Sequence, residues 1–147
     1  MLLAVAVECG RMHSAAHEAA IRASIHSVVD TNGRPLALRL TPGQQHEATV
    51  AEELLDFVPG RACLADGAYD ADWILAELRE RDLQAVIPPS ESRNRQRRFD
   101  RLLYRLRYRV EVFFHQLKAY RRIATRYDKT AHCYCAFLYV ACALLWC

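Results

Sequence analysis

Glycine and proline are scarce in this chain, since each occurs 5 times in 147 residues. Hydrophobic residues make up 52% of the sequence. This combination excludes a collagen-like chain, a disordered chain and a linker-rich scaffold, because those classes need many glycines, prolines or polar residues. A length of 147 residues is typical of one domain around a single packed core.

Lysine is nearly absent among the basic residues. Only Lys118 and Lys129 are lysines among the 20 basic side chains, and the rest are arginines. The formal net charge is +3, but the segment 93–126 alone carries +10 and the remainder −7. Such a concentration of positive charge indicates an anionic partner, and nucleic acid is the usual one. The alternative is a solvated helix face that has no partner.

The sequence also lacks a secretion signal and a membrane span. The apolar start, Met1–Val7, lacks the basic region with which a secretion signal begins, and Glu8 follows it directly. The apolar run Tyr134–Cys147 has 14 residues, fewer than the roughly 18 that indicate a membrane span. We expect this run to form a buried core helix. If it lacked a partner surface within the domain, it would instead be a patch for dimerisation or aggregation.

The 6 cysteines include no C-x-x-C pair. Among the cysteines, Cys133 and Cys135, beside His132, are a weak indication of a metal site. Free cysteines on an apolar helix behave as small hydrophobic residues. The cysteine pattern therefore predicts a reducing, intracellular compartment.

Periodic and alternating segments predict a mixed α/β domain around one sheet, with the element order β-β-α-β-α-β-α-α. Asn32 and Gly33 are expected to supply the positive φ angles of a tight hairpin turn. The segment Ser90–Arg98 has no periodicity and is predicted to be a mobile loop. The expected strands are Ser24–Asp30, Pro35–Leu40, Arg61–Ala65 and Gln84–Ile87, and the expected helices are His46–Phe57, Asp70–Arg81, Phe99–Tyr120 and Thr130 to the C-terminus.

Four polar residues of the predicted 99–120 helix share one face: Tyr104, Arg107, Glu111 and Lys118. At about 100° per residue they span roughly 60° of the helix circumference. An ion pair between Arg107 and Glu111, one turn apart, would explain part of this pattern without any function. Asp66 adds a second carboxylate at the tip of a predicted strand. Carboxylates on separate elements can hold divalent cations for phosphoryl transfer, and a basic segment can carry the phosphate backbone.

The spacing Tyr104-x2-Arg107-x3-Glu111-x6-Lys118 resembles the signature of the DDE transposases of bacterial insertion sequences. Within these, it is similar to the group typified by insertion sequence four and its relatives in the group of insertion sequence five. Four other stretches resemble the same family in the same order: the hairpin at 25–47, LADGAYDAD at 64–72, VIPPS at 86–90 and the basic stretch at 97–131. The resemblance extends over about residues 24–147.

The resemblance implies a ribonuclease-H-like fold and metal-dependent strand nicking and strand transfer at insertion-sequence ends. In this family two Asp and one Glu bind two Mg²⁺ (or Mn²⁺) ions, which activate a water or a 3′ hydroxyl and stabilise the leaving oxygen. By motif, Asp66 is the second Asp and Glu111 is the Glu, so both are expected to be catalytic metal ligands. The DNA-binding residues expected from the motif and the basic segment are Tyr104, Arg107, Lys118, Arg101, Arg105, Arg121 and Arg122.

The first Asp of the family is missing from its expected place. It belongs on the first strand, upstream of the hairpin, but no Asp precedes Asp30 in this chain. Glu8, followed by Arg11 and His13, is a candidate for an altered remnant of that motif and hence for a metal ligand. The alternative is that residues 1–23 are a divergent or non-native segment. We therefore expect 24–147 to be the portion of the catalytic domain, with a fold incomplete at its first strand.

These observations leave three functions open. The first is DNA transposition by a truncated chain that is inactive or weakly active, so whether it is an enzyme stays open. The second is a non-catalytic DNA-binding fragment that modulates a full-length transposase, and the third is an inactive product of a decayed gene. The first two predict DNA as the partner, a homo-oligomer or a full-length transposase as a second partner, no membrane, and a place in the bacterial cytoplasm at the nucleoid.

Three further residues of motif-like stretches are interpreted as structural. His46 is expected at the start of a helix, and Asp70 is expected to cap the helix that follows it. Asp128 is expected to pair with a nearby arginine.

Overall fold

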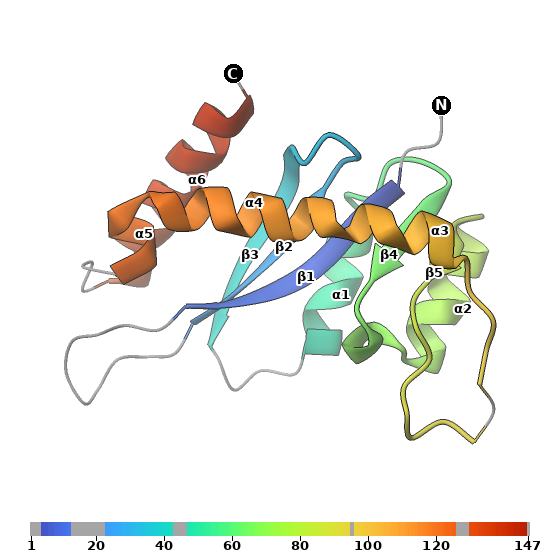
Figure 1. The fold of residues 1–147 in the computed structure, drawn as a ribbon. Coiled ribbons are helices and arrows are strands. Elements are labelled where there is room, and N and C mark those ends of the chain that lie inside the picture. Colours follow the sequence, from blue (N-terminus) through green and yellow to red (C-terminus); the bar gives the residue numbers. More distant parts are fainter. Residues whose placement is uncertain (1–3, 13–22, 43–46, 95, 126–129, 147) are drawn as a thin grey trace.

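The structure, a computed structural model, describes residues 4–12, 23–42, 47–94, 96–125 and 130–146. A five-stranded sheet is covered by helices on both faces (Figure 1). Its strands are β1 (Ala4–Met12), β2 (Ala23–Val29), β3 (Pro35–Pro42), β4 (Ala62–Ala65) and β5 (Gln84–Val86). The helices are α1 (Glu47–Leu55), α2 (Asp72–Glu80), α3 (Arg101–Tyr104), α4 (Tyr108–Ala119), α5 (Arg121–Thr125) and α6 (Ala131–Trp146), with 3₁₀ turns η1 (Gly67–Tyr69) and η2 (Arg105–Arg107).

The strand order in the sheet is β3-β2-β1-β4-β5. β1, β2 and β3 pair antiparallel, whereas β4 runs parallel to both β1 and β5. Parallel neighbours need a crossover connection, and α2 provides it between β4 and β5. This mixed sheet between helical layers is ribonuclease-H-like, so the predicted fold class is confirmed.

The central strand, β1, comes from the N-terminal segment for which the sequence predicted an incomplete element. β1 spans nine residues and is paired on both sides. It runs antiparallel to β2 from Ala6↔Val29 to Met12↔Ala23. On its other side it runs parallel to β4 from Ala4↔Ala62 to Val7↔Ala65. Without β1 the hairpin of β2 and β3 would have no hydrogen-bonded link to β4 and β5.

The turn between β2 and β3 is wider than the predicted tight turn. Gly33 has a φ of 84°, but Asn32 does not have a positive φ, which corrects the prediction for that residue. The Asp30 carboxylate organises the turn, because it accepts hydrogen bonds from the N–H groups of Asn32 at 2.8 Å and Arg34 at 2.9 Å. Such a side-chain bond to the backbone two residues on replaces the need for a second left-handed residue.

Side chains of the strands alternate between two cores on opposite faces of the sheet. On β2, Ile25 and Val29 belong to the core beneath α4 and α6, whereas Val28 belongs to the core beneath α1 and α2. On β4, Leu64 lies in the first core and Ala65 in the second. This two-residue period assigns a face to each position of the inner strands.

The predicted 99–120 helix forms α3, η2 and α4 in unbroken succession along the sheet (Figure 1). Asp100 caps its start, because its carboxylate accepts two backbone N–H groups of the first turn at 2.9 Å. Val110, Phe113 and Leu117 are fully buried, as their three- and four-residue spacing predicted. The short helix α5, which follows directly, was not predicted.

The C-terminal helix α6 buries only one of its faces. Tyr134 and Leu138 have no exposed surface, whereas Tyr139, Val140 and Leu144 are more than half exposed at 52%, 58% and 57%. The prediction of a buried helix is thus right for one face, and the other face is apolar and exposed. Among the described residues, no helix is long and apolar enough to cross a membrane.

His26 in β2 lies within a buried chain of polar groups. The residue has no exposed surface, its Nε2 lies 2.9 Å from Thr41 Oγ1, and its Nδ1 lies 3.3 Å from the Tyr69 hydroxyl. Burial lowers the pKa of His26, because the charged imidazolium would lose its hydration. The neutral ring is therefore the form that the folded state accommodates.

We expect the protein to lose stability as the pH falls through about 6.5, the ordinary pKa of a histidine in an unfolded chain. Because the pKa of His26 is lowered in the folded state, the unfolded chain binds the proton more readily as the pH falls. The free energy of unfolding therefore decreases at low pH and is restored at higher pH. Urea unfolding midpoints at pH 7.5 and 5.5 measure this difference.

His26→Gln should be less stable at pH 7.5 and show a smaller pH dependence than the wild type. His115→Gln is the matched control, because His115 is exposed and should keep the wild-type dependence. If His26→Gln kept the full pH dependence, another group would be responsible for it.

Candidate functional site

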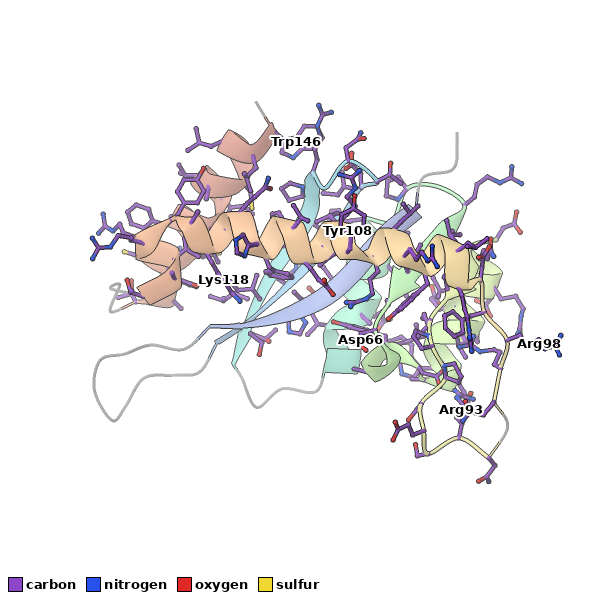
Figure 2. All side chains as sticks on the ribbon, in the orientation of Figure 1. Asp66, Arg93, Arg98, Tyr108, Lys118 and Trp146 are labelled. Carbon is purple, nitrogen blue, oxygen red and sulfur yellow. The ribbon has the colours of Figure 1, made fainter. Side chains whose placement is uncertain are left out.

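Asp66 follows β4 directly and opens the turn η1, as Figure 2 shows by its label. The turn is closed by a hydrogen bond of 2.9 Å from the Tyr69 N–H to the Asp66 carbonyl oxygen. The side chain of Asp66 is exposed and makes no hydrogen bond or ion pair with the described residues. A carboxylate presented at a strand end without a protein partner is available to a cation.

The turn that presents Asp66 is anchored from within the core. Tyr69 is 2% exposed, and its hydroxyl lies 3.3 Å from Nδ1 of His26. His26, in strand β2, therefore holds Tyr69 and with it the turn η1. This role of His26 was not predicted from the sequence, although one signal was present: His26 is a polar residue in phase with the buried Val28.

The predicted polar face of α3, η2 and α4 is present but is partly occupied by its own contacts. Nη2 of Arg107 lies 2.5 Å from Oε1 of Glu111, and their side chains are 18% and 55% exposed. The Arg107 guanidinium also lies over the Tyr104 ring at 5.6 Å, and that ring packs edge-on against Phe99 at 5.4 Å. Lys118 is exposed further along the same helix (Figure 2). The helical ion pair considered from the sequence thus exists.

The register of the sheet relates Asp66 to the candidate Glu8. Val7 pairs with Ala65, so residues 8 and 66 directly follow this pair on two adjacent parallel strands. Residue 8 also pairs with Ser27 of β2. Ser27 is two residues from both Ile25 and Val29, whose side chains lie in the core beneath α4, so it belongs to the same face of the sheet. Residue 66 continues the phase of Leu64, which belongs to the same core. Strand alternation therefore assigns positions 8 and 66 to the face that α4 covers.

The helix that carries Glu111 crosses this part of the sheet. α4 packs on β1 and β2, and η2 packs on β1 and β4. Within the described ranges, no group of three His, Cys, Asp or Glu side chains is close enough to hold a metal ion. Asp66 and Glu111 nevertheless offer hard carboxylate oxygens, the donor type that Mg²⁺ and Mn²⁺ prefer, so their chemistry fits such an ion.

The remaining predicted DNA-binding residues lie on the outer surface of the helices. Arg101 and Arg105 are exposed on α3 and η2, and Arg121 and Arg122 are exposed on α5. The Arg122 guanidinium also lies 4.2 Å from the centre of the Phe137 ring. His46 and Asp128 lie outside the described residues, so their predicted roles stay predictions.

Comparison with known protein families decides what kind of domain this is. The model of the family described as "Transposase DDE domain" matches residues 11–146. This chain belongs to the transposase DDE domain family. The predicted resemblance is thereby confirmed, and so is the association with insertion sequences and DNA recombination. DNA transposition is the activity of this family, and DNA is its partner.

Two relatives carry insertion-sequence names. The chain is 38% identical over 124 residues to a protein of Brucella ovis named as a transposase for insertion sequence element IS6501, covering 83% of this chain and 95% of that protein. It is 30% identical over 132 residues to a protein of Burkholderia cepacia named as a transposase for insertion sequence element IS402, covering 82% of this chain and 60% of that protein.

A solved structure with similarity to this domain is a piggyBac transposase synaptic complex with hairpin DNA, determined by cryo-electron microscopy. The TM-score is 0.44 at 12% sequence identity, and the match covers 62% of this chain and 24% of that one.

Asp70 has a different role in this transposase domain from the predicted helix cap. The N-cap of α2 is Ala71, and no side chain caps that helix. The Asp70 carboxylate has no exposed surface and contacts Arg93 Nε at 2.5 Å and Arg97 Nη2 at 3.1 Å. It also accepts the Ser90 N–H at 2.8 Å. The segment that the sequence predicted as a mobile loop is therefore tied to the body of the domain at three points.

These contacts of Asp70 explain why the arginine-rich segment was wrongly predicted to be a mobile loop. Arg93 and Arg97 count toward the positive charge of 93–126, but both guanidiniums are paired with Asp70, and Arg93 also contacts Asp72 at 2.7 Å. The partner lies more than twenty positions upstream, beyond the reach of local pattern analysis. Part of the basic segment is thus structural.

We expect Asp70→Asn to lower the free energy of unfolding by about 2 kcal/mol, because hydrogen bonds to a buried charged group are lost. The segment 88–99 should also be cleaved faster by trypsin. Asp72→Asn is the matched control, because Asp72 is 88% exposed and contacts the same Arg93. Its effect should stay within about 1 kcal/mol. Equal effects of the two variants on unfolding and cleavage would show that Asp70 does not anchor the segment.

Proposed function

We propose that this domain is the metal-dependent core of an insertion-sequence transposase, with Asp66, Glu111 and Glu8 as its three carboxylates. The observation that carries the proposal is the β1–β4 register, in which residue 8 and residue 66 follow the Val7↔Ala65 pair on the face crossed by α4. Glu8 takes the role that the family gives to an Asp, with a side chain longer by one methylene.

The chain's own residues have distinct tasks in this proposal. Asp66, Glu8 and Glu111 would hold Mg²⁺ or Mn²⁺, and the bound ions would activate a water or a 3′ hydroxyl and stabilise the leaving oxygen. The ion pair with Arg107 holds the Glu111 carboxylate in place at 2.5 Å before the metal arrives. Tyr104 and Lys118 lie on the same helix face as Glu111 and face the scissile DNA strand.

DNA binding in this proposal depends on arginines that the fold leaves without carboxylate partners. Arg101, Arg105 and Arg121 are exposed and make no ion pair with the described residues. They lie on the same layer of helices as Glu111. A DNA strand whose phosphates contact these arginines would therefore run close to the proposed metal-binding carboxylates. The domain would act on DNA in the bacterial cytoplasm, at the nucleoid, as a homo-oligomer or with a full-length transposase.

A second candidate function is a non-catalytic DNA-binding domain that modulates a full-length transposase. The observation that favours it is the Arg107–Glu111 pair, because a carboxylate neutralised by an arginine is a weaker metal ligand. The first candidate, in contrast, includes a truncated chain that is inactive or only weakly active in transposition. The chain covers 95% of one named relative and 60% of the other.

Plasmid nicking in Mg²⁺ or Mn²⁺ distinguishes the two functions. We expect Asp66→Asn, Glu111→Gln and Glu8→Gln each to lower the nicking rate on the order of 10²-fold or more, because each removes a charged ligand. Glu80→Gln is the control, since Glu80 is exposed on α2 and should nick like the wild type. Wild-type activity in Glu8→Gln alone would exclude Glu8, and no nicking by the wild type with intact DNA binding would favour the second function.

The salt dependence of DNA affinity tests the binding surface. Replacing Arg101, Arg105 and Arg121 together by Ala should reduce the slope of log K against log salt by about 3, roughly one for each lost phosphate contact. Arg34→Ala is the single-charge comparison, expected to change the slope by no more than about 1, because Arg34 lies in the turn before β3 with its guanidinium over the Trp146 ring. An unchanged slope in the triple variant would contradict binding through this surface.

A further inference from the structure

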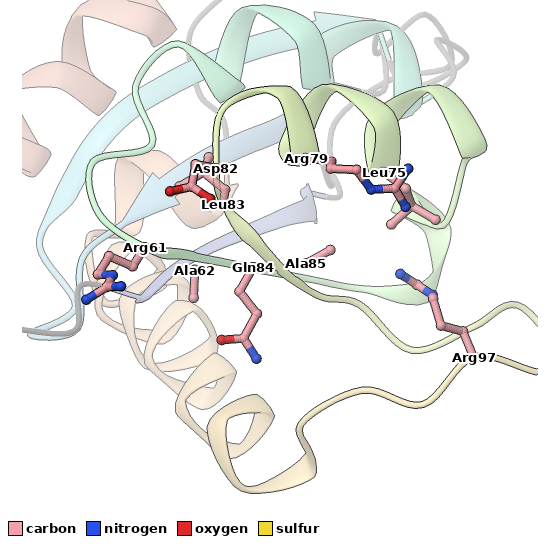
Figure 3. A pocket seen from close by; sticks show the side chains of 9 residues that line it. All are labelled: Arg61, Ala62, Leu75, Arg79, Asp82, Leu83, Gln84, Ala85 and Arg97. Carbon is pink, nitrogen blue, oxygen red and sulfur yellow. The ribbon is translucent and has the colours of Figure 1, made fainter.

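A groove of about 610 Å³ runs along the outer edge of the sheet, beside β5. We call it the β5-edge groove. Figure 3 shows Arg61 at one end and Arg97 at the other, with Arg79 on α2 and Gln84 on β5 between them. Asp82 is the one carboxylate in its lining. The groove thus brings together three guanidiniums from a strand start, a helix and the tethered 88–99 segment.

Two of these guanidiniums have no internal partner. The side chains of Arg61 and Arg79 belong to exposed residues and form no hydrogen bond, ion pair or ring contact with the described residues. By contrast, Arg97 is paired with Asp70, and the nearby Arg81 is paired with Glu77 at 2.7 Å. The charges of Arg97 and Arg81 are thus balanced by carboxylates within the fold. The charges of Arg61 and Arg79 therefore remain available to a ligand.

The base of the groove is held rigidly by the sheet. The Gln84 N–H donates a hydrogen bond of 2.8 Å to the Arg61 carbonyl oxygen, which ties the start of β4 to the start of β5. β5 is the last strand in the order, so its outer edge has no strand neighbour within the described sheet. The Gln84 side chain and this strand edge add neutral hydrogen-bonding groups between the guanidiniums.

The position of the groove separates it from the carboxylates. Ala62, in its lining, begins β4, and Asp66 follows the end of that strand. At about 3.3 Å per residue the two lie roughly 13 Å apart. Duplex DNA advances about 3.4 Å per phosphate along each strand, so this separation corresponds to about four base-pair steps. One DNA duplex can therefore contact both the β5-edge groove and the region of Asp66.

We propose that the β5-edge groove binds the sugar–phosphate backbone of DNA at a second point, separate from the site of strand cleavage. The proposal rests on the proposed function for the choice of DNA, and on Arg61, Arg79 and Gln84 for the chemistry. Guanidiniums recognise phosphate oxygens through paired N–H groups, and a neutral amide between them suits a polar, sequence-independent contact. Asp82 limits the affinity, because its carboxylate repels the same phosphates.

Substitution of Asp82 should change DNA affinity in the opposite direction from substitution of the arginines. It has a φ of 55°, a conformation that asparagine also tolerates, so Asp82→Asn removes the charge without straining the backbone. We expect Asp82→Asn to bind DNA about two- to threefold more tightly, and Arg61→Ala/Arg79→Ala about tenfold more weakly at low salt. The double variant should also reduce the salt slope by about 2. Arg97 is left intact because its pairing with Asp70 is structural.

The experiment is fluorescence anisotropy of a labelled 24-base-pair duplex, titrated with the full chain in EDTA over a range of salt concentrations. Because no cleavage occurs without metal, the result is independent of the nicking assay. Arg34→Gln is the control, since it removes one arginine charge away from the groove. Circular dichroism of every variant verifies folding, and tripolyphosphate is titrated separately as a small-molecule probe.

Weaker binding and a smaller slope in Arg61→Ala/Arg79→Ala, with stronger binding in Asp82→Asn, would support the groove as a DNA contact. Wild-type affinity in the double variant, while the Arg101, Arg105 and Arg121 variant binds weakly, would overturn the groove and leave the proposed function standing. Saturable tripolyphosphate binding that leaves duplex affinity unchanged would assign the groove to a small phosphate ligand and overturn the DNA assignment. No duplex binding by any chain would overturn both.

Discussion

The pairing of β1 with both β2 and β4 is the constraint on which the rest of this domain depends. It joins an antiparallel hairpin to a parallel βαβ unit, and thereby fixes which residues share a face of the sheet. The Val7↔Ala65 pair sets residue 8, within β1, beside residue 66, which follows the end of β4. The same register places His26 where it supports Tyr69 and the turn that presents Asp66. A shift of one residue would move residue 8 to the opposite face, away from α4.

Electrostatic pairing divides the arginines of this chain into two classes. Arg93 and Arg97 are held by the buried Asp70, and Arg107 is held by Glu111, so these charges maintain the fold or the site. Arg101, Arg105 and Arg121, and the groove residues Arg61 and Arg79, make no ion pair with the described residues and are exposed. The net charge of +3 therefore understates the local positive charge, because the unpaired arginines are gathered on particular surfaces rather than spread evenly.

Local patterns predicted much of the fold. The hairpin, the buried strand β4, the helix α2 and the long α3–α4 helix all have clear periods of two or three to four residues, and each was confirmed within a few positions. The failures come from side-chain contacts that residue patterns do not reveal, some between distant parts of the chain and some within a turn. Asp70 looks like a helix cap from its neighbours, but its partners Arg93 and Arg97 come from beyond β5. The carboxylate of Asp30 widened a turn that Asn32 and Gly33 would have made tight.

By itself the sequence determined the family, the fold class and the spacing of Tyr104, Arg107, Glu111 and Lys118 along one helix, because these follow from motifs and from the geometry of a single helix. Only the tertiary structure decided that the N-terminal segment supplies the central strand, that residue 8 lies beside residue 66, and that Arg61 and Arg79 line one groove. The physical reason is that strand register and side-chain pairing are cooperative properties of the whole sheet. No window of neighbouring residues contains both partners of such a contact.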